Sequence, residues 1–244
     1  MIKKRLFDIF LSSVGLIIFI PVLLPLIFLV WLQDYKNPFY VADRVGQGNK
    51  KFKLVKLRSM IVDADKTGVD STSKDDVRIT KIGKFIRKFK FDELTQLWNV
   101  FLGEMSFVGP RPNVERETKL YTVAERKLLS VKPGITDIAS IVFSDESEIL
   151  QPFSDPDIAY NQLIRPRKNK LALFYIQNAK ISLDLSLILL TLIAIFNKSF
   201  SLKILVRIIR KIGAEEEILE IVRRNSKLTP IPPPGSEFIV YSRD

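Results

Sequence analysis

Two adjacent carboxylates, Asp92 and Glu93, are the residues of this sequence best placed to do chemistry. They stand at the start of a predicted helix and follow three cations, Arg87, Lys88 and Lys90. One interpretation is structural, because acidic residues cap helix N-termini and interact favourably with the helix dipole. The other is catalytic, because a helix N-terminus surrounded by cations attracts phosphate. A carboxylate held there, beside a second carboxylate and Mg²⁺, could attack phosphorus as a nucleophile. The cations would lower its pKa and neutralise charge in the transition state.

Two further segments could bind phosphate. Residues 106–112, with the sequence SFVGPRP, predict either a plain loop or a rigid loop that aims the guanidinium of Arg111 at a phosphate group. Residues 132–136, KPGIT, predict a Pro-Gly turn whose backbone N–H groups could also form a nest for an anion. Since such sequences also occur in ordinary loops, their chemistry depends on where the fold places them.

The composition narrows the possible chemistry. The 244 residues include neither Cys nor His. Disulfides, thiolate nucleophiles, cysteine-ligated metal sites and imidazole bases are therefore excluded. A bound metal would have to be a hard cation with oxygen ligands, and Mg²⁺ is the first candidate. Because 47% of the residues are hydrophobic, the chain can bury a substantial core.

The element expected to anchor such a site is a run of 24 uncharged residues, 9–32, which is long enough to cross a bilayer as a helix. Pro21 and Pro25 lie in its middle, and each removes a backbone hydrogen bond, which predicts a strong kink. Basic residues flank the run on both sides, and such flanks favour the cytoplasmic side. A re-entrant helix that breaks at the prolines satisfies both observations, and a spanning helix is the alternative. A buried core helix or a cleaved signal peptide fits less well.

Most of the excess positive charge follows this run. The whole chain has a net charge of +11, and residues 36–90 hold 15 Lys or Arg against 6 Asp, a local net of +9. This basic stretch fits a solvated face attracted to anionic lipid headgroups, or a site for phosphate-bearing substrates. Nucleic acid is disfavoured as a partner, because no aromatic stacking pattern or nucleic-acid motif accompanies the charge.

The remaining patterns predict a mainly helical α+β body. They predict a hairpin over 39–60, a loop over 63–77, a short basic helix over 81–88, and helices over 91–105, 113–130 and 157–177. The apolar run 185–196 is too short to span a membrane, and fits a core helix or the membrane interface. Residues 202–212 predict an amphipathic helix that lies on a membrane or packs on the body. A Pro-rich tail from residue 229 should be extended and loosely attached.

The predicted helix 91–105 has one apolar face, made of Leu94, Leu97, Trp98, Phe101 and Leu102.

The sequence patterns divide the chain into three parts. They are a membrane-inserted helix over 1–35, a catalytic domain over 36–196, and an amphipathic helix with a Pro-rich tail over 197–244.

Three motifs in this order carry a resemblance. They read FDELTQLWNV at 91–100, GEMSFVGPRP at 103–112 and KPGIT at 132–136. Together they resemble the bacterial sugar transferases, the monotopic polyprenyl-phosphate phosphoglycosyl transferases. The opening KRLFD at 4–8, the basic segment 52–60 and LDL at 183–185 are also similar to this family, so that the resemblance covers about residues 1–196.

The resemblance implies transfer of a sugar-1-phosphate from a UDP-sugar to undecaprenyl phosphate, with release of UMP. Asp92 would be the nucleophile and form an aspartyl phosphosugar intermediate. Glu93 would help to hold Mg²⁺ or assist proton transfer. The substrate phosphates would be bound by basic and hydroxyl side chains of the same motifs: Arg87, Arg111, Lys56, Arg58, Lys132 and Thr136.

The resemblance also implies a location and partners. A re-entrant helix kinked at Pro21 and Pro25 would keep the catalytic domain on the cytoplasmic face of the bacterial inner membrane, in contact with membrane lipid. A non-catalytic membrane-surface adaptor of the same fold is the alternative function. The identity of the sugar, the glycan pathway, and whether the chain forms a homodimer stay open.

Overall fold

The computed structural model describes residues 2–64 and 76–241. The expected loop over 63–77 lies almost wholly outside the described residues. Along the chain the elements are α1 (Ile2–Leu32), β1 (Phe39–Val45), η1 (Gln47–Asn49), β2 (Lys51–Leu57), α2 (Lys81–Lys88), η3 (Phe91–Glu93), α3 (Gln96–Leu102), β3 (Ser106–Val108), α4 (Glu115–Lys119), η4 (Glu125–Ser130), β4 (Gly134–Thr136), α5 (Ile138–Val142), α6 (Glu146–Leu150), α7 (Pro156–Ala159), the π-helical turn η5 (Tyr160–Ile164), α8 (Arg165–Asn178), α9 (Ile181–Phe196), α10 (Lys198–Lys211) and α11 (Glu216–Arg223). The mainly helical α+β class is confirmed.

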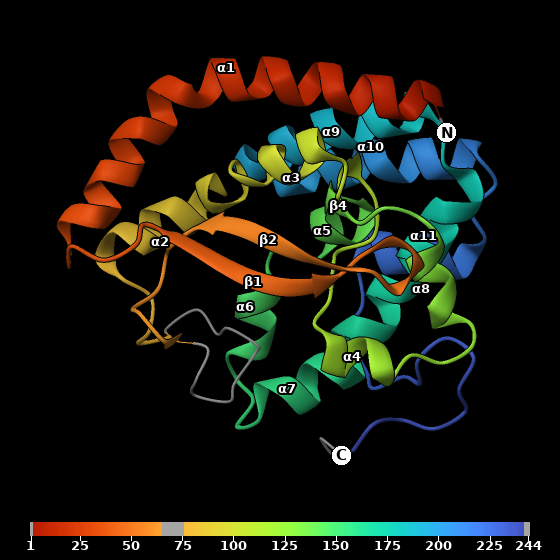
Figure 1. The fold of residues 1–244 in the computed structure, drawn as a ribbon. Helices are drawn as coiled ribbons and strands as arrows, with labels where there is room; N and C mark the ends of the chain where they lie inside the picture. The colour runs from red at the N-terminus through yellow and green to blue at the C-terminus, as the bar shows by residue number, and fades with distance from the viewer. Residues whose placement is uncertain (1, 65–75, 242–244) are drawn as a thin grey trace.

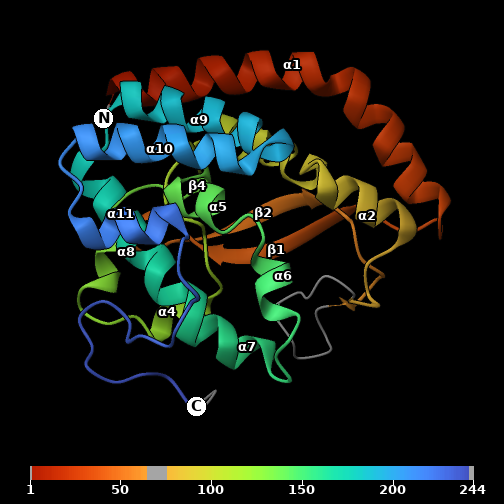
Figure 2. The same ribbon diagram turned by 180° about the vertical axis from the view of Figure 1, so that it is seen from behind.

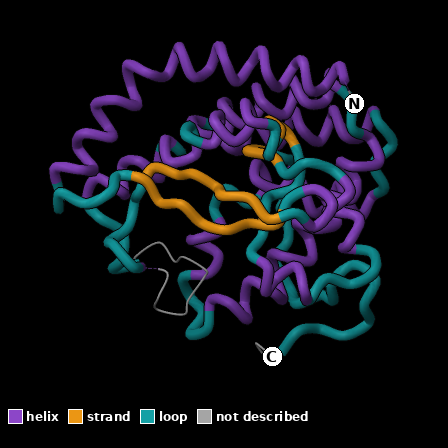
Figure 3. Tube along the Cα trace, viewed as in Figure 1, coloured by secondary structure: helices purple, strands orange, loops and turns teal. Residues whose placement is uncertain are grey.

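Helix α1 lies along one side of the body and bends partway along its length (Figures 1 and 3). Pro21 and Pro25 are inside the helix, where their missing N–H groups interrupt the hydrogen-bond ladder. Within the described residues, α1 is the helix that is long and apolar enough to cross a membrane. Most of its large apolar side chains are exposed, which is typical of a helix that meets lipid rather than a protein core.

The described residues contain two small two-stranded sheets. Strands β1 and β2 form the expected antiparallel hairpin, closed by a turn in which Gly48 takes a left-handed conformation with φ of 66°. Strands β3 and β4 pair in parallel, a pairing that the sequence did not predict. A side chain at Gly134 would place its Cβ 2.1 Å from the backbone N of Gly109, so this close approach requires glycine.

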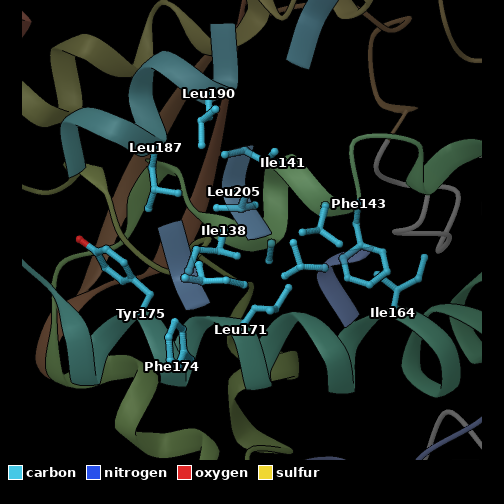
Figure 4. Close-up of a cluster of buried hydrophobic side chains, with 14 of the residues drawn as sticks. Ile138, Ile141, Phe143, Ile164, Leu171, Phe174, Tyr175, Leu187, Leu190 and Leu205 are labelled. Atoms are coloured by element: carbon cyan, nitrogen blue, oxygen red, sulfur yellow. The ribbon is translucent and has the colours of Figure 1, made fainter. Parts of the chain in front are cut away.

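The main core lies among α5, α8, α9, α10 and α11. Ile138, Ile141, Leu187 and Leu205 are completely buried and meet at its centre (Figure 4). Figure 2 shows the C-terminal helices α10 and α11 against this part of the body. Residues beyond 196 therefore pack into the same core as the helices that precede them.

Helix α3 is shorter than predicted, and its predicted apolar face is only partly buried. The expected helix over 91–105 is a 3₁₀ turn, η3, followed by α3, and Trp98 and Leu102 of its apolar face are 49% and 54% exposed. Leu97 of that face is buried, and so are the polar side chains of Thr95 and Asn99. The polar side chains face inward because they hydrogen-bond the backbone of β2, a long-range interaction that outweighs the hydrophobic periodicity.

The other predicted elements agree with the structure to different degrees. The single helix expected over 113–130 is two short elements, α4 and η4. Helix α9 has both expected characters, with Leu187 buried in the core and Leu189 exposed. Helix α10 packs on the body, since Leu205 and Ile209 are completely buried. The tail is extended but attached, because the N–H of Ile231 donates to the carbonyl of Gln162.

Candidate active site around a buried acidic pair

Asp92 and Glu93, here called the acidic pair, lie in the 3₁₀ turn η3 directly before α3. Lys90 at the start of this turn takes a left-handed conformation with φ of 56°. Such a conformation is costly for a residue with a side chain, and it persists where surrounding contacts hold it, often at functional sites. The turn allows the chain to leave α2 and present both carboxylates to the same surroundings.

Strand β2 fixes the position of the acidic pair. The Thr95 hydroxyl donates to the carbonyl of Val55 at 2.9 Å and lies 3.2 Å from the carbonyl of Asp92. The side-chain amide of Asn99 donates to the carbonyl of Lys53 at 2.7 Å, and its oxygen accepts from the N–H of Val55 at 3.1 Å. These bonds hold α3 against β2 in one register, so that the acidic pair is placed beside the end of the strand.

Cations from three elements surround the acidic pair. Lys56 of β2 has its Nζ 3.5 Å from a carboxylate oxygen of Asp92 and 3.5 Å from one of Glu93. Arg111, from the loop after β3, donates to Glu93 at 3.0 Å. Arg87 of α2 interacts electrostatically with Asp92. The structure thus brings together five of the predicted site residues.

The pKa values of the two carboxylates are shifted in opposite directions. Burial raises the pKa of Asp92, and the positive charge of Lys56 offsets this only in part. Burial also acts to raise the pKa of Glu93, but Lys56 and Arg111 outweigh it and lower the value to about 2. The nearby cations lower the pKa of both carboxylates, as expected, but at Asp92 burial outweighs them and the net shift is upward.

The donor set of the site fits Mg²⁺. No group of three or more His, Cys, Asp or Glu side chains that could hold a metal occurs in residues 2–64 and 76–241. Mg²⁺ does not require one, because it is usually bound through one or two carboxylates together with water and substrate phosphates. Asp92 and Glu93 would provide those carboxylates, and the contacts of 3.5 Å to Lys56 leave their oxygens able to accept further ligands.

Three other predicted site residues lie elsewhere. Arg58 is 7% exposed and forms hydrogen bonds of 2.5 and 2.6 Å with Asp34, just beyond the C-terminal end of α1. Lys132 is close to Gly103, at the C-terminal end of α3, whereas the acidic pair precedes the N-terminal end of that helix. Thr136 is buried, and its hydroxyl lies 2.6 Å from that of Thr191. Their role in substrate binding stays a prediction.

The sequence did not indicate Gln96 and Arg44 as candidates. Gln96 is 3% exposed, and its Nε2 has no hydrogen-bond partner among the described residues. An unpaired buried donor is costly, and this one lies one turn of helix after Asp92. Arg44 shares a face of the hairpin with Lys56 and interacts electrostatically with Arg111. The alternation of side chains along β1 could have indicated Arg44 once the pairing was known.

Comparisons with known proteins identify the family of the chain. Residues 1–198 match the protein family described as bacterial sugar transferase. A Bacillus subtilis protein, provisionally named undecaprenyl-phosphate N-acetylgalactosaminyl 1-phosphate transferase, is 47% identical over 133 residues, which are 54% of this chain and 70% of that protein. The UDP-glucose:undecaprenyl-phosphate glucose-1-phosphate transferase of Klebsiella pneumoniae is 37% identical over 204 residues, 82% of this chain and 41% of that protein. The UDP-galactose-lipid carrier transferase of Erwinia amylovora is 40% identical over 150 residues, 55% of this chain and 31% of that protein. The chain therefore spans less than half the length of two of these three relatives.

Proposed function

Because the chain belongs to the bacterial sugar transferase family, we propose that it transfers a sugar-1-phosphate from a UDP-sugar to undecaprenyl phosphate and releases UMP. This reaction is the first membrane step in the synthesis of a surface polysaccharide or glycoconjugate. The names of the relatives support the reaction class, since they specify UDP-sugars as donors and an undecaprenyl or lipid carrier as acceptor. The observation that carries the proposal is the acidic pair, buried among Lys56, Arg87 and Arg111.

Asp92 is the nucleophile in the proposed first step. One of its carboxylate oxygens attacks the phosphorus that bears the sugar, the bond from that phosphorus to the oxygen of UMP breaks, and UMP leaves. The product is an aspartyl phosphosugar. Asp92 is freer to attack than Glu93, because Glu93 accepts a hydrogen bond from Arg111 at 3.0 Å whereas Asp92 contacts Lys56 at 3.5 Å.

The second step returns the enzyme to its starting state. A phosphate oxygen of undecaprenyl phosphate attacks the same phosphorus, and the bond to the Asp92 oxygen breaks. Lys56, Arg87 and Arg111 orient the phosphate oxygens and oppose the negative charge that develops on them in both steps. Glu93 holds Arg111 in place through their direct hydrogen bond.

Asp92 and Glu93 would also hold Mg²⁺ between protein and substrate phosphates. When bound, the metal would neutralise phosphate charge and favour the ionised form of both carboxylates.

The reaction is tested by measuring UMP release from purified protein in lipid, with Mg²⁺, undecaprenyl phosphate and a panel of UDP-sugars. We expect release from at least one donor and its loss in Asp92→Asn. Release that is unchanged in Asp92→Asn would remove Asp92 from the mechanism. No release from any donor would favour the non-catalytic membrane adaptor.

For the membrane, the proposal is a re-entrant α1 that leaves the catalytic part on the cytoplasmic face of the bacterial inner membrane. Both ends of α1 are held by the same body, which supports this topology. Near its start, Lys4 forms an ion pair of 2.5 Å with Asp184. Just beyond its end, Asp34 forms one of 2.5 Å with Arg58. A helix that crossed the bilayer would place one of these contacts on the far side.

The exposed apolar surface supports the same placement. Figures 1 and 2 show α1, α3 and α9 on one side of the molecule. Large apolar side chains are exposed on all three helices, among them Leu24 on α1, Trp98 on α3 and Leu189 on α9. Exposed apolar side chains gathered on one side of a molecule are typical of a membrane contact.

Thiol labelling tests the topology directly, since the chain has no Cys and each introduced thiol is unique. Lys3→Cys and Lys36→Cys, made separately, should be labelled by an impermeant reagent from the cytoplasmic side. Labelling of the two positions from opposite sides would show that α1 spans the membrane.

A further inference from the structure

A second polar cluster lies outside the predicted site. It consists of Tyr160 at the start of the π-helical turn η5, Glu146 at the start of α6 and Lys168 on α8, and is called here the Tyr160 cluster. Lys168 forms an ion pair with Glu146, and its Nζ lies 5.4 Å from the centroid of the Tyr160 ring. The side chains of Lys168 and Glu146 are 14% and 31% exposed, so the pair is accessible to a ligand on one side.

Arg111 connects this cluster to the acidic pair. Its strongest electrostatic interaction is with Glu93, and it also interacts with Glu146. Lys168 and Tyr160 interact electrostatically with Arg111 as well. A substrate phosphate bound by Arg111 therefore lies within electrostatic range of the Tyr160 cluster.

The charge of the Tyr160 cluster differs from that of a phosphate site. Phosphate sites carry excess positive charge, whereas Lys168 and Glu146 neutralise each other. A neutral pair offers a hydrogen-bond donor, an acceptor and an aromatic face in one place. These groups suit a neutral ligand with several hydroxyl groups. In ligand sites, a small number of polar groups commonly fixes the orientation of the ligand and provides specificity.

The backbone at Tyr160 supports a role in binding. π-Helical turns are rare and occur frequently at functional sites. This one is held from outside, because Pro166 has no N–H to bond the carbonyl of Gln162, and the N–H of Ile231 in the tail donates to that carbonyl at 3.1 Å. The side-chain amide of Gln162 also donates to the carbonyl of Val240 at 2.8 Å. The tail thus stabilises an uncommon backbone conformation at the residue that faces Lys168.

We infer that the Tyr160 cluster binds the hexose of the donor and determines which UDP-sugar the enzyme uses. This inference rests on the proposed function. The hexose is joined through its anomeric oxygen to the phosphorus that Asp92 attacks, so it lies next to the phosphate that Arg111 binds. Glu146 accepts from a sugar hydroxyl, Lys168 donates to another, and the Tyr160 ring packs on the sugar.

The test compares donors rather than overall activity. UDP-glucose, UDP-galactose and UDP-N-acetylgalactosamine differ only in the sugar, so their kcat/KM values are measured for wild type and for the double variant Glu146→Gln/Lys168→Met. The double variant removes both charges and leaves the net charge unchanged. We expect the advantage of the preferred donor over the others to fall by about tenfold or more, because a site that bonds a substrate hydroxyl discriminates strongly. Inhibition by UMP should stay within about twofold of wild type.

A neighbouring ion pair is the matched control. Asp145 precedes Glu146 in the chain and pairs with Lys198 at 2.7 Å, with side chains of comparable exposure, 29% and 26%, and it also pairs with Arg224 at 3.3 Å, which the Asn of the variant still allows as a hydrogen bond. Asp145→Asn/Lys198→Met should keep the wild-type order of donors. A merely structural role for the Tyr160 cluster would instead lower kcat/KM equally for all donors, and that result overturns the inference.

Equilibrium binding separates this inference from the proposed function. Binding of the three UDP-sugars and of UMP to wild type and to Glu146→Gln/Lys168→Met needs no turnover. Weaker binding of UMP by the same factor as the UDP-sugars would place the nucleotide, not the sugar, at the cluster. If wild type binds none of these ligands, the proposed function fails and the inference fails with it.

Discussion

Two buried acidic sites in this molecule, Asp184 and the acidic pair, differ in how closely their partners contact them. Asp184 is 1% exposed and receives short bonds from Lys4 at 2.5 Å and from the Tyr175 hydroxyl at 2.6 Å, a network that we call the α1 anchor. The acidic pair instead shares one lysine at 3.5 Å, and a second cation contacts only one of its members. A buried carboxylate whose oxygens are held by short hydrogen bonds serves to hold the fold together. The longer contacts of the acidic pair leave its oxygens able to bind substrate and metal, at a cost in stability.

Asp92→Asn should give the largest effect. Removing the nucleophile should lower UMP release by about 10³-fold or more, because residual binding cannot replace a covalent step. The stability should be equal to or greater than that of wild type, since the variant removes a poorly satisfied buried carboxylate. UMP release and the melting temperature in detergent check both parts. A variant that loses activity through unfolding would show a lower melting temperature.

Arg111→Lys should have the next largest effect. Lysine keeps the charge but loses the planar guanidinium, so kcat/KM for the donor should fall by about 10²-fold. The measurement is steady-state kinetics at saturating Mg²⁺ and lipid acceptor. Wild-type kinetics would show that Arg111 acts only through its charge.

Asp184→Asn addresses the other side of the comparison. Lys4 would keep a partner of the same shape but without charge, which should cost about 2 kcal/mol of unfolding free energy. Donor kinetics of the folded fraction should change little, because the α1 anchor does not contact the acidic pair through its own hydrogen bonds. A selective loss of kcat with unchanged stability would contradict the structural role of the anchor.

Arg58→Gln and Asp34→Asn should have smaller effects. Each removes one partner of the same ion pair at the end of α1. We expect a loss of about 1 kcal/mol from Arg58→Gln, because the remaining Asp34 side chain is 34% exposed, and a larger loss from Asp34→Asn, because the buried guanidinium of Arg58 then keeps only a neutral partner. The hydrogen bond from Arg58 lowers the pKa of Asp34 to about 2 from its ordinary 3.8. The stabilisation is therefore present above pH 3.8 and is lost as the pH falls towards 2, which acid titration of the two variants against wild type will show. A larger effect of Arg58→Gln on donor KM would restore Arg58 as a substrate residue.

Thr136→Val should give the smallest effect. It removes a buried hydroxyl that bonds Thr191, at a cost of about 1 kcal/mol, and leaves UMP release unchanged. Thermal unfolding and donor KM are the measurements. A raised KM without a stability change would indicate that the hydroxyl binds substrate, as the sequence predicted.

Strand β2 shows where sequence reasoning succeeded and where it stopped. The alternation of side chains predicts Lys56 and Arg58 on the same face. Lys56 does reach the acidic pair, but β2 ends at Leu57, so Arg58 leaves the strand and binds Asp34 instead. The end of a strand depends on what packs around it, and here that is α1, which precedes it by a long stretch of chain.

Helix α3 teaches the same lesson about periodicity. Its apolar spacing correctly predicted a helix, but it did not show which face is buried, because Thr95 and Asn99 bond the backbone of β2. The pairing of β3 with β4 was hidden for another reason, since strands of three residues carry too few side chains to show alternation.

The sequence alone therefore predicted the acidic pair, its basic surroundings, the hairpin and the proline-kinked apolar helix, because charge, hydropathy and proline act through neighbouring residues. The tertiary structure decided which cations reach the acidic pair, that both ends of α1 contact one body, and that Tyr160, Glu146 and Lys168 meet beside Arg111. Those contacts join residues far apart in the chain, and their geometry follows from packing and long-range hydrogen bonds rather than from local pattern.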